Sequence, residues 1–453
     1  MMGLRLRLDQ RLRDWRVRGG RLLVGILVAA VSTVAVASCQ MPTDNPALTT
    51  PAMGNPGPTW TVPAPTGLPT TPSASSTPEA ATSPTADATS TAEPSPTRSP
   101  QPSATPPSPP AATATGRPKP SPAASQANSA LFKDTADNFD AGERSGVEAS
   151  PKGLTLIASQ GQYTSPVQET PFAFNNAVLS WVADAPTGTS LKLEMRVRVD
   201  GTWSRWYTMG TWANGRGASA HGQSDGFGQV DIDTLKLRQP AQAFQYRATL
   251  SGSDATLVLR SVAVAYADMS RPLNGPAVPL EANWARDLPV PQISQAVQDP
   301  AIRWEICSPT SLTMVLNYWG ANKPLMEVVS GVRDGTAGIY GNWPLNTAYA
   351  ATQGFDAHVA RFHSVEQLQN EIANGRPVVV SVRFAAGQLD NSPISSTTGH
   401  LIVVRGFTAN GDVIVNDPAA PSHDTVRRVY HRDQFSRVWL SSGGIAYTLA
   451  PTD

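Results

Sequence analysis

The sequence predicts a multidomain protein in which a lipid anchor and a disordered linker carry an N-terminal β-sandwich and a C-terminal α+β domain. Three observations predict this arrangement. An uncharged apolar run follows an arginine-rich N-terminus, and a long stretch of Pro, Ser, Thr and Ala comes next. Beyond it, hydrophobicity of period two gives way to mixed helical and strand patterns. At 453 residues the chain is long enough for two or three domains that each bury a core.

Residues 1–38 have the pattern of an export signal. Seven arginines up to Arg21 precede an apolar run, Leu22–Ala37, which is short for a membrane-spanning helix because that needs about 20 apolar residues. The run ends in Val36-Ala37-Ser38-Cys39, which resembles a bacterial lipobox. The resemblance implies cleavage before Cys39 and a lipid on its sulfur. We expect the chain to be anchored on the outer face of the bacterial cell membrane; an uncleaved signal anchor is the alternative.

Residues 39–128 consist mainly of Pro, Ser, Thr and Ala and have almost no large apolar side chains. Such a composition cannot offset the chain entropy that is lost on folding. We therefore expect a disordered linker that, at up to ~3.1 Å per residue where it is polyproline-like, reaches on the order of 200 Å from the membrane.

Residues 131–270 alternate between apolar and polar side chains, as in the run from Leu191 to Val199. Alternation buries one face of a strand, and several short runs separated by Gly- and Asn-rich breaks predict an antiparallel β-sandwich. This region also contains a group of aromatic residues: Trp181, Trp203, Trp206, Tyr207 and Trp212. They are typical of a packed core, and the alternative is a face on which a polysaccharide stacks.

Charge and ligand spacing exclude other classes of function. The 35 Lys and Arg residues balance the 35 Asp and Glu residues, and no basic block follows the N-terminal region, so we expect no nucleic-acid partner. The six histidines and two cysteines have no spacing that closes a ligand set, so we expect no metal and no other cofactor.

Residues 285–453 hold a candidate nucleophile, Cys307. Helically spaced apolar residues follow it, with a proline suited to the first turn and a glycine suited to the end: Leu312, Val315, Leu316 and Trp319, with Pro309 and Gly320. Cys307 is thus expected at the N-terminus of a buried helix. The helix dipole and the backbone N–H groups favour a thiolate there, which nucleophilic attack on a carbonyl requires.

A candidate base is His400, because it alone among the histidines opens a strand-like run, Gly399–Phe407. After the Asn410-Gly411 turn signal, a second strand-like run ends at Asp417. We expect His400 and Asp417 on paired antiparallel strands, on the same face of the sheet.

The spacing of these two residues does not by itself bring them together. With a two-residue turn, Asp417 faces Val404, which lies four residues or ~13 Å along the strand from His400. A wider turn, a bulge at Gly406 or strand curvature is needed to close this distance.

The motifs resemble those of papain-like cysteine peptidases of the bacteriocin-processing, double-glycine leader peptidase family. The resemblance rests on Cys-Ser-Pro-Thr-Ser-Leu from Cys307, Gly-His-Leu-Ile-Val-Val from Gly399 and Val-Asn-Asp-Pro from Val415, and it covers about residues 290–450. It implies a papain-like fold for residues 285–453.

The resemblance also implies the roles of four residues. Cys307 would attack the carbonyl carbon, His400 would take and return the proton, and Asp417 would orient the imidazole. The side chain of Gln295 and the backbone N–H of Cys307 would hold the oxyanion. We expect His423 and His431, which have no such role, at the surface.

These features predict an exported thiol hydrolase that cleaves peptide or amide bonds, with a peptide or a cell-wall peptide as substrate. Many relatives have glycine on both sides of the nucleophile, whereas this chain has Ile306 and Ser308. The alternative is therefore a catalytically silent papain-like domain, in which these side chains block the cleft and the protein only binds a peptide or the cell wall.

Overall fold

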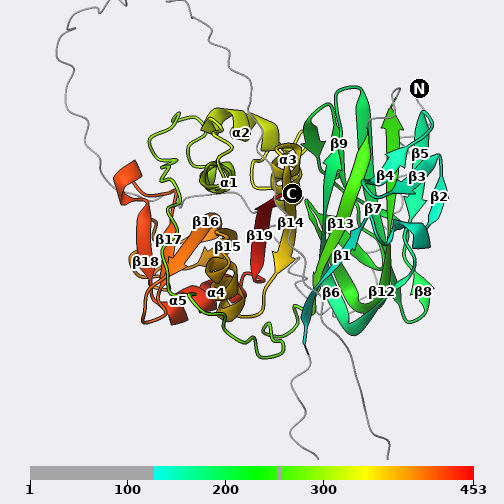
Figure 1. The fold of residues 1–453 in the computed structure, drawn as a ribbon. Helices are drawn as coiled ribbons and strands as arrows, with labels where there is room; N and C mark the ends of the chain where they lie inside the picture. The colour runs from blue at the N-terminus through cyan, green and yellow to red at the C-terminus, as the bar shows by residue number, and fades with distance from the viewer. Residues whose placement is uncertain (1–126, 253–256, 453) are drawn as a thin grey trace, which may run out of the picture. The chain divides into compact units, whose positions relative to one another are not determined.

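The computed structural model describes residues 127–252 and 257–452 (Figure 1). The predicted export signal, Cys39 and all but the last two residues of the predicted linker lie outside the described residues. Both described stretches fall within one compact unit. Within them, every helix is too short or too polar to cross a bilayer.

Residues 129–267 form a domain of antiparallel strands. Its strands are β1 (Ser129–Thr135), β2 (Glu143–Ser145), β3 (Val147–Ser150), β4 (Gly153–Leu156), β5 (Gln160–Thr164), β6 (Gln168–Asp184), β7 (Thr189–Val199), β8 (Thr202–Trp203), β9 (Tyr207–Ala213), β10 (Arg216–Ala218), β11 (Gly228–Asp231), β12 (Thr234–Gly252) and β13 (Val258–Ala267), with one short 3-10 helix, η1 (Phe139–Ala141). Leu191, Leu193 and Met195 of β7 are buried and alternate with more exposed residues, except that Glu194 is itself buried against Arg247. Alternation of this kind is what makes one face of the strand part of the core.

The strands of this domain differ from the two separate sheets of a simple sandwich, because all of them belong to one hydrogen-bonded network. The long strand β12 pairs with β6 and β11 in its first half and with β7 and β5 in its second. Its pairing with β6 shifts register between Lys236 and Ala243, where the strand is irregular. Such irregularities bend a strand, so one strand continues from one part of the β domain into another.

The clustered aromatic residues serve packing in this domain. Trp181, Tyr207 and Trp212 are buried in the core. Trp203 and Trp206 are partly exposed, but the Arg196 guanidinium lies 4.6 and 4.7 Å from their ring centres. Cation–π contacts therefore occupy a face of each ring that a sugar would need for stacking.

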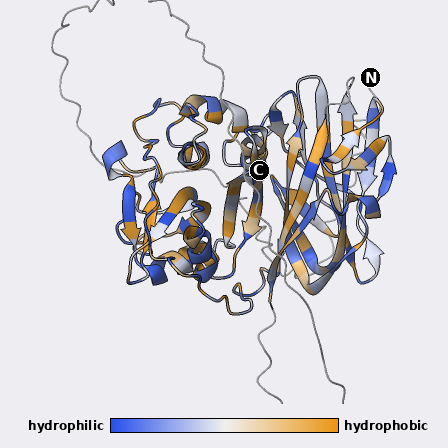
Figure 2. Ribbon diagram, viewed as in Figure 1, coloured by the Kyte–Doolittle hydropathy of each residue, from blue (hydrophilic) through white to orange (hydrophobic). Residues whose placement is uncertain are grey.

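The C-terminal domain combines one antiparallel sheet with five helices among the described residues. The sheet has the order β14 (Phe355–Arg361), β19 (Ile445–Pro451), β15 (Val378–Phe384), β16 (Thr397–Phe407), β17 (Val413–Asn416) and β18 (Arg427–Tyr430). The helices are α1 (Cys307–Tyr318), α2 (Leu325–Val332), α3 (Trp343–Thr352), α4 (Val365–Ala373) and α5 (Arg432–Leu440), with a 3-10 helix, η2 (His423–Thr425). The middle strands of the sheet are strongly hydrophobic (Figure 2), and β16 and β17 are almost entirely buried.

Helix α1 packs against β15 and β16 and is buried more completely than its one-sided apolar pattern predicts. All ten residues Cys307–Leu316 are buried, including several hydroxyl residues. The hydroxyls of Thr310 and Thr313 donate to the carbonyl groups of Ile306 and Pro309, one turn earlier. Polar positions of this helix can lie in the core because their hydroxyl groups have hydrogen-bond partners there.

The edge strand β14 joins the C-terminal domain to the β domain, since it contacts β6 and β13. The backbone N–H of Val359 donates to Ser180 Oγ at 3.0 Å. At another point of the same interface, the backbone N–H of Ser219 donates to Asp334 Oδ1 at 3.0 Å. The β domain is thus fixed to the C-terminal domain by buried polar contacts.

Candidate active site

Cys307 is the first residue of α1 and is 1 % exposed. One turn further on, the Ser311 hydroxyl donates to the carbonyl oxygen of Leu401 at 3.0 Å. Residues four apart lie on the same face of a helix. Cys307 therefore lies on the face of α1 that is turned to β16, where His400 is the neighbour of Leu401.

His400 and Asp417 form a buried pair, and each is 1 % exposed. His400 Nε2 lies 2.8 Å from Asp417 Oδ1. The Tyr430 hydroxyl donates to Asp417 Oδ2 at 2.7 Å, and the backbone N–H of Ala419 donates to Oδ1 at 3.0 Å. Burial alone raises the pKa of Asp417, but the charge of His400 and these hydrogen bonds outweigh burial and lower it below its usual value. Asp417 is thus a carboxylate at neutral pH.

Two changes of register bring this pair together. Phe407 pairs with Val413, so the loop is longer than a two-residue turn and moves the pairing by one residue. A bulge between Val404 and Gly406 moves it by one more, so that Val403 pairs with Asn416. Asp417 comes directly after Asn416. It therefore lies diagonally across from His400, on the same face of the sheet.

The bulge at Gly406 has a second partner, the segment that leads to Gln295. Gly406 forms an isolated bridge with Asp287, and Leu288 N–H donates to the carbonyl of Arg405 at 2.9 Å. A Cβ atom on Gly406 would lie 2.2 Å from the carbonyl oxygen of Arg286. Only glycine permits this approach, which fixes residues 286–288 beside the strand that carries His400.

Gln295 is held next to Asp417. Its backbone N–H donates to the carbonyl of Pro418 at 2.8 Å, and the neighbouring Ser294 N–H donates to His423 Nδ1 at 3.1 Å. The Gln295 side chain is 1 % exposed, and its Oε1 has no hydrogen-bond partner among the residues that the structure describes. This oxygen can only accept hydrogen bonds, so the expected role in holding an oxyanion would fall to Nε2 of the same side chain.

The residues that flank Cys307 point into the protein interior. Ile306 and Ser308 are both fully buried. The Ser308 hydroxyl donates to Asn346 Oδ1 at 2.9 Å and lies 3.0 Å from the Tyr447 hydroxyl. Ser308 is therefore a link between α1, α3 and β19.

Several residues of the site carry no recognisable signal in the sequence. Tyr430 reaches Asp417 from β18, and Ser311 reaches the backbone of β16 from α1. A tyrosine near the end of a strand and a serine in a helix are ordinary residues at such positions. His423 and His431 are exposed, as expected, although His423 also holds Ser294.

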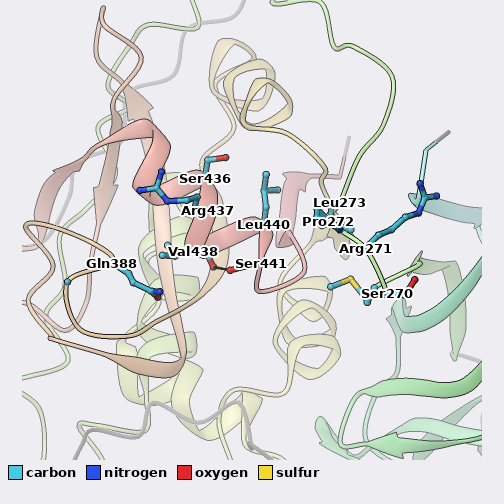
Figure 3. Close-up of a pocket in the computed structure, with 12 residues that line it drawn as sticks. Ser270, Arg271, Pro272, Leu273, Gln388, Ser436, Arg437, Val438, Leu440 and Ser441 are labelled. Carbon is cyan, nitrogen blue, oxygen red and sulfur yellow. Dashed lines mark hydrogen bonds between the residues drawn. The ribbon is translucent and has the colours of Figure 1, made fainter. Parts of the chain in front are cut away.

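The part of the chain that the structure describes contains two cavities of interest. A cavity of about 190 Å³ reaches Gly399, the residue before His400. A larger, mainly apolar cavity of about 840 Å³ lies between the segment Met269–Leu273 and helix α5 (Figure 3). Met269 and Ser441 line both, so the two cavities are neighbours.

Both domains match known protein families. Residues 287–447 match the peptidase C39-like family, and residues 130–267 match the peptidase C39 N-terminal domain. No curated protein matches the chain.

Two solved structures show similarity at low identity. One is a double glycine motif protease from an AMS/PCAT transporter in complex with the leader peptide, with 22 % identity over 39 % of this chain and 100 % of that chain, at a TM-score of 0.27. The other is a C39-like peptidase from Bacillus anthracis, with 20 % identity over 36 % of this chain and 96 % of that chain, at a TM-score of 0.29. From the two family matches, the C-terminal domain belongs to the C39-like peptidase family and follows a C39 N-terminal domain.

Proposed function

We propose that this protein is an exported thiol peptidase that cleaves peptide or amide bonds. The observation that carries the proposal is the buried His400–Asp417 pair, at 2.8 Å, beside the helix that begins with Cys307. A buried carboxylate bonded to one ring nitrogen of a histidine is the arrangement that orients the imidazole in a catalytic triad. The membership of residues 287–447 in a peptidase family supports the same chemistry.

In the proposed reaction, the Cys307 thiolate attacks the carbonyl carbon of the substrate and forms a C–S bond. The carbonyl oxygen becomes an oxyanion, which the Gln295 amide and the Cys307 backbone N–H stabilise. Protonated His400 gives its proton to the leaving amine as the C–N bond breaks, and a thioester remains. Water then attacks the thioester with His400 as base, and the product is a carboxylic acid with the thiolate restored.

Asp417 would act by fixing the imidazole. With Nε2 bonded to Asp417, Nδ1 is the ring nitrogen that exchanges the proton with Cys307. The lowered pKa of Asp417 keeps it an acceptor at neutral pH, so it stabilises the imidazolium that forms during the reaction.

One observation weakens the alternative in which the domain binds a peptide without cleaving it. It requires Ile306 and Ser308 to block the cleft, but both side chains are buried, and Ser308 is bonded to Asn346. The substrate is a peptide or a cell-wall peptide. Binding of a polysaccharide to the β domain has less support, because Trp203 and Trp206 stack on Arg196.

The experiment that tests the activity is digestion of a mixed peptide library and of purified cell wall by the reduced protein. New amino termini should appear with the natural chain and should be absent with Cys307→Ala. Cleavage that continues at full rate in Cys307→Ala would assign the activity to another residue or to a contaminant.

We also propose that the protein is a lipoprotein anchored to the outer face of the cell membrane. The pattern Val36-Ala37-Ser38-Cys39 after an uncharged apolar run supports this. Mass spectrometry of the mature protein should find an N-terminal, lipid-modified Cys39, and Cys39→Ser should release the chain from the membrane fraction. A mature chain that still carries residues 1–38 would replace the lipid anchor with a signal anchor.

A further inference from the structure

The cavity of about 190 Å³ lies where the β domain meets the peptidase domain. The turn Asp231–Thr234 between β11 and β12 forms one wall, and Arg361, Ser381 and Gly399 of the peptidase sheet form another. Pockets for drug-sized ligands measure ~300–1,000 Å³. This cavity is smaller, so it suits a group about the size of one amino-acid residue.

Arg361 is the buried cation of this cavity and is 5 % exposed. Its Nη1 donates to the carbonyl of Gly443 at 2.9 Å, and its Nη2 donates to Asn176 Oδ1. Both oxygen partners are neutral. Its Nε is buried and has no hydrogen-bond partner within the described stretches. Burial lowers the pKa of Arg361 to about 10, so it remains a cation at neutral pH.

A buried guanidinium with an unused N–H group is unfavourable unless an acceptor completes it. A carboxylate is the natural acceptor, because its two oxygens match the geometry of the guanidinium and carry the opposite charge. The unused Nε of Arg361 therefore points to an anionic group in the cavity.

Asp233 lines the same cavity but already has hydrogen-bond partners. Its Oδ2 accepts from the backbone N–H of Trp343 at 2.9 Å, and its Oδ1 accepts from the Thr234 hydroxyl at 2.9 Å. Ile232, beside it in the turn, has a φ of 58°, a conformation that is strained for a β-branched residue. Asp233 thus holds the turn against α3; its charge partly offsets the effect of burial on the pKa of Arg361, but its oxygens leave Arg361 Nε without an acceptor.

The charges around the cavity favour an anion. Its lining includes three cationic residues, Lys236, Arg361 and Arg383, and two acidic ones, Asp231 and Asp233. The formal sum is 3 − 2 = +1 with all five ionised. Lys236 and Asp231 form an ion pair with each other, which leaves the two arginines against Asp233.

We propose that this cavity binds a carboxylate group of the peptide substrate, with Arg361 as its buried partner. Gly399 lines the cavity and precedes His400 on β16, so the cavity reaches the strand that carries the proposed base. The assignment of the bound group to a peptide substrate rests on the proposed peptidase function. Because two domains form the cavity, the β domain contributes to substrate selection as a part of the site.

The test is calorimetric binding to the reduced Cys307→Ala chain, which cannot turn substrate over. The probes are N-acetylglycylglycine with a C-terminal carboxylate, its C-terminal amide, and an N-acetylglutamyl amide with only a side-chain carboxylate. The carboxylates should bind roughly tenfold or more tightly than the amide, as expected for a charge-assisted contact. The two carboxylate probes distinguish a substrate C-terminus from an acidic side chain.

Two variants change the charge of the cavity in opposite directions. Arg361→Lys removes the Nε donor and should weaken carboxylate binding. Asp233→Asn keeps the shape of the side chain, removes a negative charge and should strengthen carboxylate binding several-fold, a gain that misfolding does not produce. Asp184→Asn is the matched control, because Asp184 pairs with Arg260 at the surface, outside the cavity.

Equal binding of carboxylates and amide overturns the proposal, and so does an Asp233→Asn variant that binds no more tightly than Asp184→Asn. The outcomes separate this inference from the proposed function. Carboxylate binding without turnover by the natural chain would support the carboxylate subsite and contradict the proposed peptidase function. Turnover with no preference for carboxylate peptides would support the peptidase function and contradict the subsite.

Discussion

Asp417 Oδ1 lies 2.8 Å from His400 Nε2, although the two residues are on neighbouring strands and a simple hairpin would hold them far apart. The longer loop and the bulge near Gly406 each contribute one residue of register shift. Two shifts bring Asp417 close to His400 and keep both residues on the same face of the sheet. One shift alone would turn Asp417 to the other face.

Replacing Asp417 should reduce the rate less than replacing His400 does. In Asp417→Asn the base and the nucleophile remain, but the imidazole loses its carboxylate partner. We expect kcat to fall by roughly 10²-fold or more, and by a larger factor in His400→Ala, by analogy with other catalytic triads. Single-turnover kinetics on one peptide measures this order. An Asp417→Asn loss as large as that of His400→Ala would mean that Asp417 has a further role.

Tyr430→Phe should destabilise the protein in a pH-dependent manner. The Tyr430 hydroxyl stabilises the Asp417 carboxylate, and the lowered pKa of Asp417 means that its contribution is present above the usual value of 3.8 and is lost as the pH falls through the folded-state pKa. Hydrogen bonds to charged groups contribute about 1.5–3 kcal/mol. We expect a loss of this size at pH 7 and a smaller loss in acid.

Urea unfolding at several pH values measures the effect of Tyr430→Phe. Tyr266→Phe is a suitable control, because burial is the cause of the raised pKa of Tyr266 and no carboxylate contributes. A loss in Tyr430→Phe that is the same at all pH values would show that its hydroxyl does not act through the charge of Asp417.

Gly406→Ala should disrupt the contact between the strand of His400 and the segment that leads to Gln295. A Cβ atom there would lie 2.2 Å from the carbonyl oxygen of Arg286, which is backbone and cannot rotate away. We expect a loss of about 1–3 kcal/mol in the free energy of unfolding, together with reduced activity. Gly226→Ala is the matched control, since nothing lies within 4 Å of its Cβ position. Equal stability of the two variants would contradict the close approach.

Ser308→Gly tests whether Ser308 limits access to the cleft. Because its hydroxyl bonds to Asn346 and contacts Tyr447, we expect the variant to lose about 1 kcal/mol or more of stability and to gain no activity. Thermal unfolding and peptide hydrolysis measure the two effects. A faster enzyme with unchanged stability would favour the alternative in which Ser308 obstructs the substrate.

The sequence predicts the local elements well where the pattern is long and regular. The helix from Cys307 and the strands around His400 and Asp417 lie close to their expected positions. Gly406 was recognisable as a candidate bulge, because glycine inside a strand often marks one.

Other features depend on contacts between distant segments and have no local signal. The continuous network of the β domain arises from bends in β6 and β12, which alternation does not reveal. Arg361 and Asp233 are 128 positions apart in the sequence and come from different domains, yet they line one cavity. The near-complete burial of α1 likewise depends on the elements packed around it.

The most direct test of the account is the pH dependence of Cys307 alkylation. In reduced Cys39→Ser protein, Cys307 is the one cysteine of the chain, and labelling with iodoacetamide can be followed by mass spectrometry. We predict labelling well below the pH at which an ordinary thiol, with a pKa of ~8.5, reacts, and a shift to higher pH in His400→Ala. Labelling of Cys307 only at the pH of an ordinary thiol, unchanged by His400→Ala, would contradict the proposed thiolate and imidazolium pair.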